Sequence, residues 1–116
     1  MINRAAVILK YNAPAIKWIN VTDPFNHDQG ITDDSVNDDR TVYLIRDEDA
    51  DSPDTLNKWI KLNYKTLFEN ELYGWYTDER LWPPKRDLKL FKKWFEVQCH
   101  TVLIDTVEEP IIDDEP

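Results

Sequence analysis

The segment Ser52–Leu72, SPDTLNKWIKLNYKTLFENEL, predicts the longest helix of the chain. Ser52 can cap a helix, Pro53 suits the first helical position, and Asp54 suits the positive end of the helix dipole. Residues at helical spacing then share one face, namely Leu56, Trp59, Ile60, Asn63, Tyr64 and Leu67. We expect this face to pack on a core, with the helix ending near Gly74.

Asn63 is the polar member of that otherwise apolar face. A buried asparagine needs hydrogen-bond partners. We therefore expect Asn63 either to hydrogen-bond across the core or to mark a less buried groove.

A second amphipathic helix is expected over roughly Lys85–Val97. Its apolar side carries Leu88, Leu90, Phe91, Trp94, Phe95 and Val97, and lysines line the opposite stripe. The double proline Pro83-Pro84 prevents this helix from continuing the first one, so residues 75–84 are read as a connection.

Four segments are interpreted as strands: 5–11, 15–21, 41–46 and 99–107. A short helix over 14–20 competes with the second of them. The resulting order β-β-β-α-α-β predicts an α+β two-layer sandwich, with two amphipathic helices on one face of a mostly antiparallel sheet of about four strands. Residues 1–107 are expected to form a single domain, followed by an acidic tail at 108–116.

The net charge of the chain excludes some classes of binding partner. The chain of 116 residues has a net charge of −9, which argues against duplex DNA and anionic membranes as partners. The apolar run Ala5–Leu9 is too short for a signal peptide or a membrane span, and Cys99 is the single cysteine. We therefore expect a soluble protein of the reducing cytoplasm.

The stretch Asp23–Asp39, DPFNHDQGITDDSVNDD, is the most acidic connection. Neither register of a calcium loop places a glutamate at its twelfth position, so a dedicated EF-hand is excluded. A solvated connection, a docking surface and a weak divalent-cation site stay open. The docking alternative uses three apolar anchors, Phe25, Ile31 and Val36. Four acids accompany them: Asp33, Asp34, Asp38 and Asp39.

Catalytic signals are weak. Cys99 and His100 would point to opposite faces of a strand and could not form a nucleophile–base pair. Carboxylates adjacent in sequence do not make a catalytic pair, and two glycines could hardly build a phosphate loop. The sequence predicts no catalytic residue, no metal ligand and no cofactor.

Bulky side chains gather in the connection after the first helix: Trp75, Tyr76, Arg80, Leu81 and Trp82. They either complete the core or form a partner surface, because Trp, Tyr and Arg dominate interface hot spots. Our leading hypothesis is a non-catalytic protein–protein interaction module that binds a basic protein or a second copy of itself. A small enzyme or ligand-binding domain with its site between sheet and helices, using His100 or an acid at a strand end, is the alternative.

Overall fold

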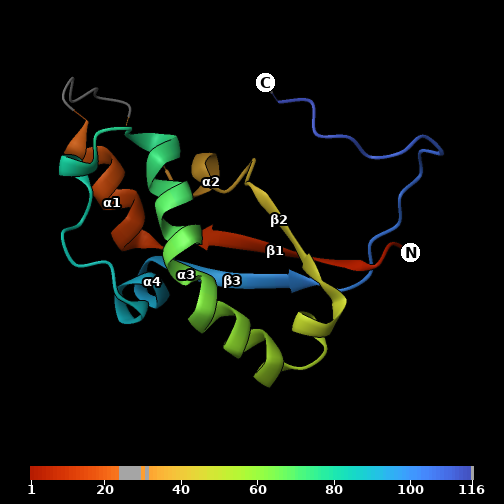
Figure 1. The fold of residues 1–116 in the computed structure, drawn as a ribbon. Helices are drawn as coiled ribbons and strands as arrows, with labels where there is room; N and C mark the ends of the chain where they lie inside the picture. Colours follow the sequence, from red (N-terminus) through yellow and green to blue (C-terminus); the bar gives the residue numbers. More distant parts are fainter. Residues whose placement is uncertain (24–29, 31, 116) are drawn as a thin grey trace.

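The computed structural model describes residues 1–23, 30 and 32–115, and these form an α+β fold (Figure 1). The α-helices and strands are, in chain order, β1 (Arg4–Tyr11), α1 (Ala13–Thr22), α2 (Asp33–Val36), β2 (Val42–Arg46), α3 (Pro53–Trp75), α4 (Leu88–Trp94) and β3 (Phe95–His100). Two 3₁₀ turns, η1 (Asp47–Ala50) and η2 (Glu79–Leu81), follow β2 and α3.

The described part of the sheet has three antiparallel strands in the order β2-β1-β3. Because successive side chains of a strand alternate between faces, Val7, Leu9 and Tyr11 point one way and join the core with side chains of α1, α3 and α4. The register places another set on the opposite face: Arg4, Ala6, Ile8, Lys10, Val42, Leu44, Arg46, Glu96, Gln98 and His100. None of these ten residues belongs to the core cluster, and we call this surface the open face.

Helix α3 confirms the prediction for Ser52–Leu72. Ser52 and Thr55 form a capping box, in which the Ser52 hydroxyl accepts from the Thr55 backbone and the Thr55 hydroxyl accepts from the Ser52 backbone. Ile60, Leu67, Phe68 and Leu72 are buried against the sheet. The helix runs through Gly74 to Trp75, so the predicted end at Gly74 is one residue short.

The predicted strand over 15–21 is wrong, and the competing helix is correct. Asn12 is extended and Pro14 lies in the first turn, where a proline costs no intrahelical hydrogen bond. Ala15 and Ile19, four residues apart, are the buried positions of α1. The described sheet therefore has three strands in place of the expected four, and the helices outnumber the expected two.

The predicted second helix is too long, and the last strand begins earlier than expected. Helix α4 ends at Trp94, whose carbonyl accepts from the Asn12 backbone N–H, and β3 begins at Phe95. Phe95, Val97 and Cys99 then alternate into the core. Residues 101–115 contain no helix or strand and, except for the backbone bond from Ile2 N–H to the Leu103 carbonyl, extend beyond the body of the molecule (Figure 1).

The helices of the described residues were compared with the requirements of a membrane span. None of their helices combines the length and the apolar character that a membrane span requires.

Candidate functional site

A hollow lies between β2 and α3, and we call it the β2–α3 groove. Its volume is about 600 Å³. Its lining residues are Arg4, Leu44, Ile45, Arg46, Glu48, Asp49, Thr55, Lys58, Trp59, Leu62 and Asn63. Leu44 and Ile45 point to opposite faces of the sheet, and both line the groove. The groove therefore opens at the edge of β2 that the described strands leave unpaired.

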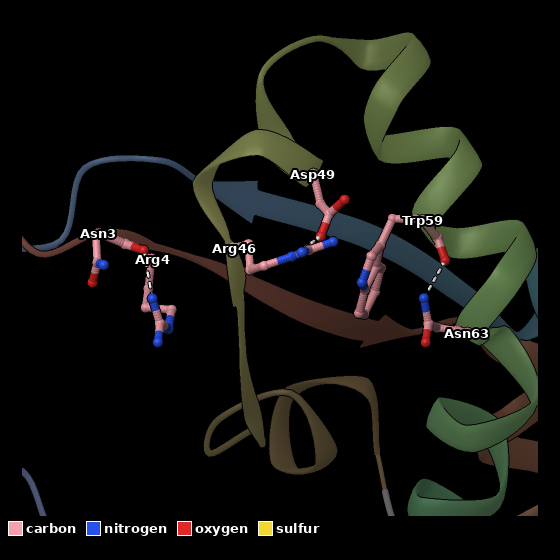
Figure 2. Close-up of polar contacts among 6 residues, drawn as sticks. All are labelled: Asn3, Arg4, Arg46, Asp49, Trp59 and Asn63. Atoms are coloured by element: carbon pink, nitrogen blue, oxygen red, sulfur yellow. Dashed lines mark hydrogen bonds and ion pairs between the residues drawn. The ribbon is translucent and has the colours of Figure 1, made fainter.

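Figure 2 shows how the groove is walled. Arg46, at the end of β2, and Asp49, from η1, form an ion pair with 3.2 Å between Nε and Oδ2. Trp59 and Asn63 face them from α3, where the Asn63 amide donates to the Trp59 carbonyl at 2.8 Å. Asn63 therefore bonds within its own helix and marks the less buried groove, the second of the two expected roles.

Charge in the groove has the opposite sign to that of the whole chain. Three cations, Arg4, Arg46 and Lys58, line it with two acids, Glu48 and Asp49. Since Arg46 is paired with Asp49, the remaining charges in the lining are the cations Arg4 and Lys58 and the single acid Glu48. The net charge of the chain is −9, so this is a locally cationic site on an acidic protein.

Apolar side chains beside the groove are exposed. Leu62 of α3 is 84% exposed, and Val42 and Leu44 of β2 are each 52% exposed. These three residues give the free edge of β2 an apolar border on both faces of the sheet. An apolar border beside unpaired backbone groups is a template on which another strand can form.

A second, smaller hollow of about 180 Å³ lies at the other end of β2, where the carboxylate of Glu71 is the central group. The Tyr11 hydroxyl donates to Glu71 Oε1 at 2.8 Å, and the Tyr43 hydroxyl donates to Oε2. Trp75 Nε1 donates to the Tyr11 oxygen at 2.9 Å, and the Asn70 amide donates to the Tyr43 oxygen at 2.8 Å. This network joins β1, β2 and α3.

Both tyrosines of the network are held neutral. Burial raises the pKa of Tyr11, and the nearby Glu71 charge raises it further. Burial also raises the pKa of Tyr43, together with its hydrogen bond to Glu71. Since each hydroxyl donates its proton to a carboxylate oxygen, the arrangement acts as a structural clamp between strands and helix.

Most of the aromatic side chains predicted in the connection at 75–84 make contacts within the fold. Trp82 is 7% exposed and donates to the Tyr76 carbonyl at 2.7 Å. Trp75 is half-buried in the Glu71 network, and the Tyr76 hydroxyl donates to the Ile19 carbonyl. Arg80 and Leu81 are exposed, and Arg80 is paired with Asp78 at 2.9 Å.

Among the predicted acids whose side chains are described, Asp39 lines the smaller hollow, and Asp34 and Asp38 line neither. Asp34, Asp38 and Asp39 are exposed, Asp33 begins α2, and Phe25 lies outside the described residues. Within the described ranges no group of three histidines, cysteines or carboxylates could hold a metal ion. The weak cation site at 23–39 falls partly on undescribed positions.

Cys99 and His100 point to opposite faces of β3, as the strand pattern predicts. Cys99 packs against the core, where burial raises the pKa of its thiol, and His100 lies on the open face. The two side chains therefore do not form a nucleophile–base pair.

Sequence reasoning missed Leu62 and the Glu71 network. Leu62 carried a usable signal, because it is an apolar residue outside the apolar face of its helix. The Glu71 network carried none, because its hydrogen bonds join residues 27 to 64 positions apart.

No family model, curated protein or solved structure matches the chain.

Proposed function

We propose that this protein is a non-catalytic protein–protein interaction module, and that it binds its partner along the free edge of β2. The observation that carries the proposal is the β2–α3 groove, where an unpaired strand edge, exposed apolar side chains and cations meet.

The backbone of the partner would supply strand pairing. An extended segment that adds to a sheet edge forms main-chain hydrogen bonds and places alternate side chains on the two faces of the sheet. Side chains on one face would meet Trp59 and Leu62 of α3. Side chains on the other face would lie beside Val42 and Leu44 on the open face.

The charges of the groove select the composition of that segment. Arg4 and Lys58 favour carboxylates, while Leu62 and Leu44 favour apolar side chains. The partner is therefore an extended segment that mixes acidic and apolar residues. Exposed charges steer the encounter more than they hold the complex, so the apolar contacts and the strand pairing must supply most of the affinity.

The basic partner expected from the sequence would use a different surface. Asp34, Asp38 and Asp39 are exposed and could steer it, with Arg80 and Leu81 at the periphery. Trp82 does not contribute to such a surface in the folded chain, because its side chain is buried. A basic partner stays a prediction, and the groove favours an acidic one.

A peptide titration tests the proposal. The probe is a ten-residue peptide that alternates valine with glutamate, added to the isotope-labelled full chain and followed by amide chemical shifts. We expect the shifts to change at 42–46 and 58–63. A matched peptide with lysine in place of glutamate should bind at least about tenfold more weakly, because it meets Arg4 and Lys58.

Two variants of the full chain control the titration. Leu62→Glu places a carboxylate in the groove and should abolish binding. Val21→Asp makes a similar change at an exposed position of α1 and should leave binding intact. Changes spread evenly over the molecule, or equal binding of both peptides, would contradict the proposed site.

A further inference from the structure

The residues after β3 have the composition that the groove selects. Positions 105–116 carry six acids and no cation: Asp105, Glu108, Glu109, Asp113, Asp114 and Glu115. Five large apolar side chains between 102 and 112 are exposed: Val102, Ile104, Val107, Ile111 and Ile112. Exposed apolar side chains gathered in one segment mark a candidate interaction surface. We call residues 102–112, which hold the first three of these acids, the acidic apolar segment.

The start of this segment is already directed beyond the sheet. The Leu103 carbonyl accepts from the Ile2 backbone at 2.8 Å, which fixes the chain beside the beginning of β1. From there the segment runs clear of α3 (Figure 1). An extended chain over 102–112 reaches up to roughly 35 Å, which is enough to reach a neighbouring molecule.

We propose that the acidic apolar segment of one copy occupies the β2–α3 groove of a second copy, and that the exchange is reciprocal. This inference rests on the proposed function of the groove. Two copies related by a twofold axis would each donate one segment and receive one, so the assembly closes as a dimer. Ile104 and Val107 would meet Leu62 and Leu44, and the carboxylates would lie near Arg4 and Lys58.

The assembly is tested by sedimentation of the full chain, whose mass is 13.8 kDa. We expect the wild-type chain to sediment as a dimer that weakens as salt is added, because the exposed charges become screened. Ile104→Asp in the segment and Leu62→Glu in the groove should each give a monomer. Both side chains are largely exposed, so the fold should be retained, which circular dichroism checks. Val21→Asp is the matched control and should stay dimeric.

Mixing the two variants gives a sharper result. The Ile104→Asp chain keeps an intact groove, and the Leu62→Glu chain keeps an intact segment. One of the two exchanged contacts can then form, so the mixture should produce a heterodimer at concentrations where each variant alone is monomeric. A mixture that stays monomeric contradicts the exchange, as does a wild-type chain that sediments as a monomer.

Failure of the dimer and failure of the groove are distinguishable. A monomeric wild-type chain that still binds the valine–glutamate peptide at β2 would overturn the exchange and leave the proposed function standing. A monomeric chain that binds no such peptide would overturn both. A dimer that survives Ile104→Asp and Leu62→Glu would place the self-contact elsewhere and overturn the exchange.

Discussion

Glu71 is the residue on which three elements converge. Its two carboxylate oxygens accept from tyrosines of β1 and β2, while its backbone belongs to α3. Hydrogen bonds to a charged acceptor are stronger than those between neutral groups. A donor left without its acceptor in a half-buried site lowers the stability of the fold. Glu71 therefore fixes the far end of β2 to the helix, opposite the end that forms the groove.

Glu71→Gln should lower the free energy of unfolding by about 1 to 3 kcal/mol, because the amide replaces one accepting oxygen with a donor. Urea denaturation measures the loss. Glu69→Gln on the same helix is the control, since Glu69 is exposed and its Arg86 partner is 4.0 Å away. Equal effects of the two substitutions would show that the network contributes no stability.

The tyrosines of this network predict a loss of stability at alkaline pH. Their folded pKa values lie above the ordinary tyrosine value, so the stability that they contribute is complete below about pH 10 and is lost as the pH rises above it. Tyr43→Phe should make the decline of Tm with rising pH shallower. Tyr73→Phe, at an exposed position of α3, should leave the slope unchanged. Parallel curves for wild type and Tyr43→Phe would contradict this assignment.

At the scale of elements, the connection between α3 and α4 is part of the core. Trp82→Ala should cost about 3 to 5 kcal/mol in unfolding free energy, because it empties a buried site. Leu81→Ala, one residue earlier and exposed, should cost less than about 1 kcal/mol. Chemical denaturation of both variants gives the comparison. If Trp82→Ala lowers the unfolding free energy only slightly, the assignment of Trp82 to the core is contradicted, and Trp82 is again a candidate partner contact.

The elements that the sequence predicted well are those with local signals. Ser52, Pro53 and the helical spacing through Leu67 predict α3, and the runs at 5–11 and 41–46 predict β1 and β2. The strand predicted over 15–21 is wrong because Pro14 can either end a strand or begin a helix. The boundary between α4 and β3 was missed because Trp94-Phe95 is apolar on both sides of it.

The candidate site was less predictable than the fold. Asn63 and Leu62 mark the groove from one helix, but β2 and η1 complete it from residues 44–49. Which strand lies at the edge depends on the pairing of β1 with β3, about 90 residues apart. Pairings at that separation leave no periodic trace in a single sequence.

At the scale of the molecule, the chain distributes its charge unevenly. The groove and the open face gather cations on a protein of net charge −9, and the acidic apolar segment carries the opposite sign. We propose that the segment of one copy covers the β2 edge of another. Both proposals follow from this one asymmetry.

Amide hydrogen exchange at the edge of β2 tests the central claim most directly. The Ile104→Asp full chain, whose groove is intact and not filled by a second copy, is measured with and without the valine–glutamate peptide, and β3 serves as the internal control because it is the other edge strand. Strand addition predicts that the outward amides of residues 42–46 slow at least about tenfold on binding, while those of 95–100 keep their rates. Unchanged exchange in β2, or equal slowing in both strands, would contradict binding along the free edge of β2.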